Sequence, residues 1–144
     1  MKIEHFEDIK VWRDARALAC EVFEICRTEP LNKDYELKNQ MNRSSGSIMD
    51  NIAEGFERGG KKEFIQFLYI AKGSAAELRS QLYRCLDRHY INDQVSHEMI
   101  ERTRDVSRQL GGFLSYLKSS EYKGPKFVHE PSVSYEGHGP DNES

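Results

Sequence analysis

The stretch SIMDNIAEGFERGGKKEFIQFLYIAKGSAAELRSQL, residues 47–82, decides the fold of this chain. Apolar side chains recur in it at steps of three and four, which is the period of an amphipathic α-helix. The pair Gly59-Gly60 interrupts this period and predicts a tight link between two helices. Polar and small residues also recur at helical spacing, although an amphipathic helix does not require them.

The same apolar period extends outward from this stretch in both directions. We expect four helices, over residues 8–28, 34–57, 61–88 and 93–119. No segment alternates with period two over a useful length, so the chain is expected to be all-α. Four long helices with short links predict an up-down-up-down antiparallel four-helix bundle over residues 1–120.

The C-terminal segment, residues 121–144, has a different composition. It holds three of the four prolines and shows no helical period, so we expect it to be disordered beyond about Phe127. The alternative is a peptide that docks on a partner or a neighbouring subunit through Phe127, Val128 and Tyr135.

Charge is distributed unevenly between these two parts. Residues 1–120 carry 19 basic and 19 acidic side chains, whereas residues 121–144 carry 2 basic and 5 acidic ones. The bundle is therefore neutral, and any basic surface on it must be local. No apolar run approaches the roughly 18 residues of a membrane span, and the N-terminus lacks the apolar stretch of a signal peptide. We expect a cytoplasmic protein that does not enter the membrane.

The three cysteines, Cys20, Cys26 and Cys85, do not have the spacing of a zinc site. All three fall at or near core positions of the expected helices. We expect them to be buried free thiols, since free cysteine behaves as a small hydrophobic residue.

A polar stripe lies beside the apolar stripe of the second expected helix, about a quarter-turn from its centre. On the third expected helix, a group of small, apolar and polar residues lies largely opposite the core. Three interpretations stay open: a second packing surface, within the bundle edge or between subunits; a solvated face; or a ligand site. The residues concerned are Gln40, Arg43, Ser47, Asn51, Glu54, Gly55 and Arg58 on the second helix, and Ile70, Gly73, Ser74 and Glu77 on the third.

The sequence offers little for catalysis. Di-iron bundles need Glu-x-x-His motifs, which are absent, and HEMIE around His97 lacks the second histidine of a zinc protease. Glu54 and Glu77 could form a carboxylate pair, but an ion pair from Glu54 to Arg58 at i+4 explains Glu54 more simply. We expect no enzyme, no cofactor and no metal site.

Two ordered motifs resemble those of the 23S rRNA-intervening-sequence protein family, also called the S23 ribosomal protein family. They are Q-x-x-R-x-x-x-S-I-x-x-N-I-A-E-G and F-L-x-I-A-x-G-S-x-x-E-L, and the resemblance spans about residues 6–118. It implies a four-helix bundle that assembles as a barrel-like homopentamer. Related bundles accompany diversity-generating retroelements and bind nucleic acid and the reverse transcriptase. The matching positions are Gln40, Arg43, Ser47, Ile48, residues 51–55, Phe67, Leu68, Ile70, Ala71, Gly73, Ser74, Glu77 and Leu78.

The nucleic-acid-binding relatives are strongly basic, whereas this bundle is neutral, so a nucleic-acid site here must be a local patch. Lys61, Lys72 and Arg79 fall within about 20° of one another on the third expected helix. Arg58 and Lys62 lie at the tight link beside them. The alternative is a solvated rim, since Glu57 and Glu63 flank the cluster.

These observations lead us to expect a non-enzymatic oligomeric bundle that binds RNA or DNA, RNA in the first place, or a nucleic-acid enzyme such as a reverse transcriptase. The binding would depend on phosphate contacts, and Tyr69 and Tyr83 are the nearest candidates for stacking on bases. The alternative function is a protein-interaction scaffold without affinity for nucleic acid.

Overall fold

The computed structural model describes residues 2–119 and residue 131. Within them lie four α-helices: α1 (Lys10–Cys26), α2 (Tyr35–Glu57), α3 (Lys61–Asp87) and α4 (Asp93–Ser119). Short 3₁₀ helices, Phe6–Asp8 and Leu31–Lys33, precede α1 and α2. The all-α prediction is confirmed for this part of the chain, and the expected limits of the helices differ from the observed ones by two residues or fewer.

The helix limits follow from local chemistry. Asp34 accepts a hydrogen bond from the Leu37 main-chain N–H at 3.2 Å and caps α2. Asn92 accepts one from the Val95 main-chain N–H at 2.8 Å at the start of α4. Gly59 has a φ of +86°, a backbone conformation that residues with a side chain rarely adopt. This conformation turns the chain from α2 into α3.

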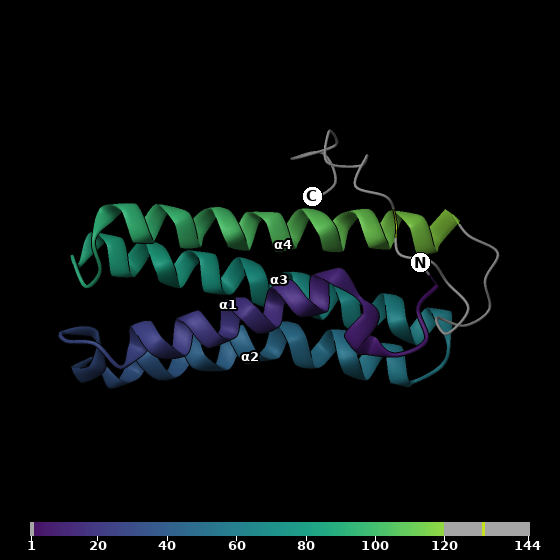
Figure 1. Ribbon diagram of the computed structural model, residues 1–144, viewed down its shortest axis with the longest axis horizontal. Coiled ribbons are helices and arrows are strands. Elements are labelled where there is room, and N and C mark those ends of the chain that lie inside the picture. The colour runs from purple at the N-terminus through teal and green to yellow at the C-terminus, as the bar shows by residue number, and fades with distance from the viewer. Residues whose placement is uncertain (1, 120–130, 132–144) are drawn as a thin grey trace.

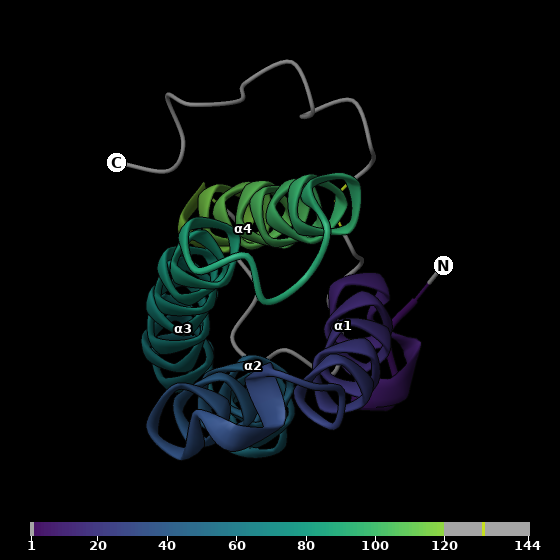
Figure 2. The same ribbon diagram turned by 90° about the vertical axis from the view of Figure 1, so that its left-hand side faces the viewer.

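The helices run antiparallel in sequence order around a common core (Figures 1 and 2). Viewed along the bundle, α1, α2, α3 and α4 follow one another around a ring (Figure 2). Helix α3 packs along both α2 and α4, whereas α1 and α4 touch over a much shorter length. The ring is therefore least tightly closed between its first and last helices.

The core contains the apolar stripes of all four helices. Phe64 lies edge-on to Phe56 and to Phe113, with ring centroids 5.9 and 5.4 Å apart, and so joins α2, α3 and α4 at one end. The segment before α1 adds Ile3 and Ile9, both buried. None of the helices in the described part of the chain combines the length and apolar character that a membrane span requires.

The cysteine prediction is wrong at one of its three positions. Cys26 and Cys85 are buried, and burial raises the pKa of these thiols to about 11 and about 12. Cys20 is exposed, because it follows the buried Leu18 by two residues and so lies about 200° around the helix. The predictions for the C-terminal segment, including docking through Phe127, Val128 and Tyr135, lie outside the described residues.

Candidate functional site

The polar stripe of α2 meets α3 within the same subunit. The hydroxyls of Ser47 and Ser74 are 2.8 Å apart, and the Asn51 amide donates to both the hydroxyl and the main-chain oxygen of Ser47, at 2.9 and 2.8 Å. Nearer the other end of α2, Arg84 donates to the Gln40 amide oxygen. These residues form the α2–α3 seam, and its polar groups are paired across the helices or within α2, as buried polar groups must be.

Two further members of this seam did not stand out in the sequence. Ser44 donates to the Gln81 amide oxygen at 2.7 Å, and both residues are buried. The available signal was spacing: Ser44 precedes Ser47 by three residues, and Gln81 follows Ser74 by seven. Each therefore continues a stripe by whole helical turns.

A glycine sets the distance between the helices in this seam. A Cβ added to Gly55 would lie 2.6 Å from the Cβ of Phe67, closer than real side chains approach. Nothing lies within 4 Å of the corresponding position at Gly73. The close approach within the chain therefore occurs at Gly55, while Gly73 faces outward.

The remaining motif residues line the outside of this seam, and we call them the outer rim: Arg43, Glu54, Ile70, Gly73 and Glu77. All five are exposed, and Ile70 has 51 % of its surface accessible. Glu54 forms the expected ion pair with Arg58, at 2.8 Å. The motif thus divides into a hydrogen-bonded inner part and an open outer part with one large apolar side chain.

The basic residues proposed from the sequence to bind nucleic acid lie in two places. Arg58 lies at the α2–α3 link, where its guanidinium carbon is 5.2 Å from the Phe67 ring centroid. Lys62 lies close by in the first turn of α3 and is exposed. Lys61, Lys72 and Arg79 follow a different line, along the flank of α3 that faces α4.

Contacts between α3 and α4 locate this flank. Lys118 donates to the Tyr69 hydroxyl and lies 4.7 Å from the centroid of that ring, and Arg104 donates to the Tyr83 hydroxyl at 3.3 Å. Tyr69 and Tyr83 are 14 residues apart, which is about 21 Å of helix, and Lys72 and Arg79 lie between them on the same flank. We call this surface the α3–α4 basic face: Tyr69, Lys72, Arg79, Tyr83, Arg104 and Lys118.

The charge of this face is positive and only partly compensated. Arg104 pairs with Glu101 at 2.9 Å, but Arg79 has no carboxylate partner within residues 2–119. The α3 flank carries no acidic side chain between Lys61 and Tyr83, since its positions are 61, 65, 69, 72, 76, 79 and 83. Arg104 and Lys118 were not predicted, although their separation of 14 residues matches that of the two tyrosines.

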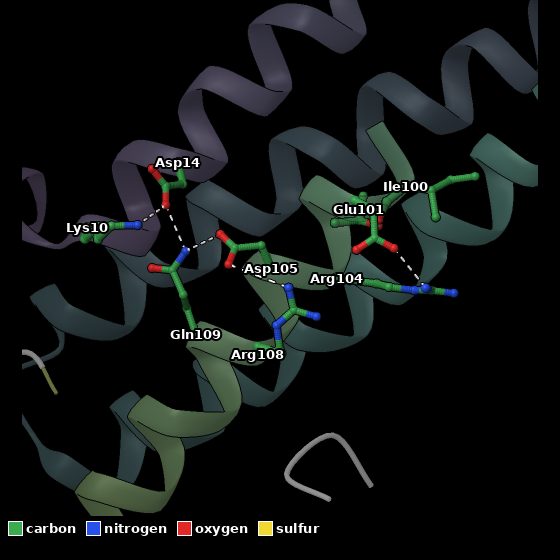
Figure 3. A network of polar contacts seen from close by, with 9 residues as sticks. Lys10, Asp14, Ile100, Glu101, Arg104, Asp105, Arg108 and Gln109 are labelled. Atoms are coloured by element: carbon green, nitrogen blue, oxygen red, sulfur yellow. Dashed lines mark hydrogen bonds and ion pairs between the residues drawn. The ribbon is translucent and has the colours of Figure 1, made fainter. Parts of the chain in front are cut away.

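In the α1–α4 seam, charged side chains and one glutamine form the contacts between the helices (Figure 3). The Gln109 amide nitrogen donates to Asp14 at 2.8 Å and to Asp105 at 2.9 Å, and Lys10 pairs with Asp14 at 2.7 Å. Burial raises the pKa of Asp14, but the hydrogen bonds from Lys10 and Gln109 outweigh it, so that pKa falls below its ordinary value.

A cavity of about 210 Å³ lies in this seam between Leu18 on α1 and Val106 on α4. Arg102 lines it and pairs with Glu21 across the seam. Within the described residues no group of three or more His, Cys, Asp or Glu side chains is arranged to hold a metal ion.

Comparison with known proteins gives a match to one family model and to four chains among the solved structures. The family model described as 23S rRNA-intervening sequence protein matches residues 7–112. A solved structure, described as a protein of unknown function from the S23 ribosomal protein family of Bacteroides thetaiotaomicron, superposes with a TM-score of 0.68 at 21 % identity. The match covers 74 % of this chain and 99 % of that one, and it shows a shared fold. No curated protein matches significantly.

Proposed function

This chain belongs to the family of 23S rRNA-intervening sequence proteins, and from this premise and the surfaces described above we propose that it is a non-enzymatic, oligomeric bundle that binds nucleic acid. RNA is the first candidate and DNA the second. The binding depends on phosphate contacts with little reading of base sequence.

The α3–α4 basic face carries this proposal. Four cations, from Lys72, Arg79, Arg104 and Lys118, lie along about 21 Å of one surface, since helical rise is 1.5 Å per residue. Arg58, Lys61 and Lys62 extend the positive charge toward the α2–α3 link. A row of cations of this length can contact several consecutive phosphates, although the bundle as a whole is neutral.

We also propose that the outer rim is the surface through which copies of the chain assemble, as a pentamer by family analogy. Ile70 gains burial there, and Gly73 lets a neighbouring backbone approach. Symmetry would repeat the basic face around the ring, so that one nucleic acid contacts several copies and binds more tightly than to one copy. A reverse transcriptase or another nucleic-acid enzyme is the protein partner that the family suggests, in the cytoplasm.

Binding of a labelled structured RNA across a salt series tests the nucleic-acid role. If the four cations each neutralise a phosphate, the slope of log K against log salt is about −3 to −4. The double variant Lys72→Glu/Arg79→Glu should abolish binding at moderate salt. Lys33→Glu/Arg13→Glu changes the net charge equally on exposed positions elsewhere and should retain most of the affinity.

A well-behaved oligomer that binds no RNA even at low salt would contradict this role. The alternative, a protein-interaction scaffold, would then take its place, and the exposed Ile70 of the outer rim favours it. A protein interface that is largely apolar would lack the steep salt dependence of phosphate contacts.

Gly73→Leu tests the assembly surface. The position is open within the chain, so the variant should fold with unchanged or slightly increased stability. Light scattering should nevertheless report monomers, because the leucine separates the two backbones. An oligomer of unchanged mass would exclude Gly73 from the interface.

A further inference from the structure

A groove lies at the end of the bundle where α1 leads into α2. It shares no residue with the two seams, the outer rim or the α3–α4 basic face. It encloses about 470 Å³, a volume in the range of small-ligand sites. Its lining residues belong to α1, α2 and the link between them. These two helices meet across the ring from the contact of α3 with α4 (Figure 2). No carboxylate is among its lining residues, which are Phe23, Cys26, Arg27, Asn32, Tyr35, Lys38 and Asn42.

Two aromatic rings line the groove, and both are exposed. Phe23 and Tyr35 have 52 % and 68 % of their surface accessible, the two largest values among the exposed large apolar side chains of residues 2–119. Each ring has a cation over one of its faces, which leaves the other face for stacking: the Arg27 guanidinium carbon is 5.7 Å from the Phe23 centroid, and the Lys38 ammonium is 4.8 Å from the Tyr35 centroid. The groove thus offers flat apolar faces next to positive charge.

Asn32 adds a hydrogen-bond acceptor that lacks a donor. Its amide oxygen is buried and has no hydrogen-bond partner within the described residues. The Lys38 ammonium donates to the neighbouring main-chain oxygen of Asn32, at 3.3 Å, and so leaves the amide oxygen unpaired. Burying an acceptor in this way costs free energy, and a ligand N–H group would recover it once the amide turns toward the groove.

We propose that this groove binds an unpaired nucleobase and its phosphate. The base stacks against Phe23 and Tyr35, and the Asn32 amide turns so that its oxygen accepts from an amino group on the base edge. Arg27 and Lys38 contact the phosphate. Glu24 pairs with Arg27 at 3.4 Å, and both side chains are mostly exposed, so a phosphate can replace this carboxylate.

Charge and shape favour this ligand class over others. A purely apolar ligand would use neither the Lys38 ammonium nor the weakly paired Arg27 guanidinium, and a small anion would leave the rings exposed. A nucleotide satisfies both groups at once, since aromatic side chains stack on bases whatever their identity. A free nucleotide and an unpaired base within a strand share this chemistry.

Binding of adenosine monophosphate to the full chain, followed by ligand-detected NMR, tests the proposal. Ribose 5-phosphate, which lacks the base, should bind at least about tenfold more weakly. Tyr35→Ala and Phe23→Ala should each weaken binding by about fivefold to about a hundredfold, which is the range for lost base stacking. Lys38→Gln should also weaken it, whereas Lys33→Gln, at an exposed position outside the groove, should not.

Circular dichroism of each variant checks that it is folded, which is expected because the substituted side chains lie outside the core. Equal binding of adenosine monophosphate and ribose 5-phosphate would overturn the base site. So would unchanged binding in Tyr35→Ala and Phe23→Ala, or the absence of nucleotide binding in a chain that binds a synthetic acidic peptide. A short oligoadenylate distinguishes the two sources: if it binds more tightly than the mononucleotide, the base comes from a strand.

The site does not depend on the α3–α4 basic face. The variant Lys72→Glu/Arg79→Glu should still bind adenosine monophosphate when it has lost structured RNA. Conversely, Tyr35→Ala should still bind structured RNA whose bases are all paired. The proposal for the groove and the proposal for the α3–α4 basic face can therefore be refuted independently.

Discussion

The α2–α3 seam and the α1–α4 seam close two sides of one bundle by different means. In the first, a glycine brings the helices together, and serine, glutamine and asparagine side chains form hydrogen bonds across the contact. In the second, the helices touch over a shorter length, and Lys10, Asp14, Gln109 and Asp105 form a charged network beside a cavity.

The difference indicates where the bundle is firm and where it can open. A close contact gains dispersion energy along its length and excludes water from its hydrogen bonds. A partly exposed network gains little, because water competes for the same groups and salt screens the charges. We therefore expect the α2–α3 seam to resist local unfolding and α1 to separate first.

Among the substitutions that test this difference, Gly55→Ala should change the free energy of unfolding most. The added Cβ meets the Cβ of Phe67 at 2.6 Å, so one helix must move. Overpacking of this kind costs about 1–3 kcal/mol, and it exceeds the gain in helix propensity. Urea unfolding followed by circular dichroism measures the change in the free energy of unfolding.

Gly46→Ala is the matched control. Gly46 lies in the same helix, and nothing is within 4 Å of its Cβ position. There the higher helix propensity of alanine should stabilise the protein, by about 0.5–1 kcal/mol. If both variants were stabilised, Gly55 would not set the distance between α2 and α3.

The hydroxyl pair should give the next largest effect. Ser47→Ala and Ser74→Ala should each cost about 1 kcal/mol, because each removes the hydrogen bond between the two hydroxyls. The double variant should cost less than the sum, since the second substitution removes no further Ser–Ser bond. Ser80→Ala, on the exposed side of α3, should change stability by less than about 0.5 kcal/mol. Strict additivity in the cycle would contradict a direct contact.

The four helices could be predicted because their causes are local. Apolar period, the Gly59-Gly60 link and the caps before α2 and α4 all act within a few residues of sequence. Spacing also revealed that α2 carries a second stripe. It did not reveal which neighbour that stripe faces, because spacing defines a face of a helix and not the element packed against it.

Contacts that depend on a neighbouring helix could not be predicted from the sequence. Gly55 and Gly73 look alike in a helical pattern, and only the position of Phe67 makes one of them a close contact. Arg104 and Lys118 join Tyr83 and Tyr69 only when α4 lies beside α3 in one register. Reading one helix at a time misses surfaces that two helices build together.

The smallest effect concerns pH and should appear in the α1–α4 seam. The pKa of Asp14 in the folded chain lies below its ordinary value of 3.8. The stabilisation by the ionised carboxylate is therefore fully present above pH 3.8 and lost as the pH falls through the lower, folded pKa. Asp14→Asn should destabilise the protein at pH 7 by about 0.2–1 kcal/mol, the range for partly exposed pairs.

The pH dependence of that difference separates the two seams. Unfolding of the wild type and Asp14→Asn, measured from pH 7 to pH 3, should give free energies that draw closer toward the acid end, as the Asp14 carboxylate becomes protonated. The coupling between Ser47 and Ser74 contains no titrating group and should keep its value over the same range. A difference for Asp14→Asn that stayed constant would mean that packing beside the cavity, and not charge, holds α1 against α4.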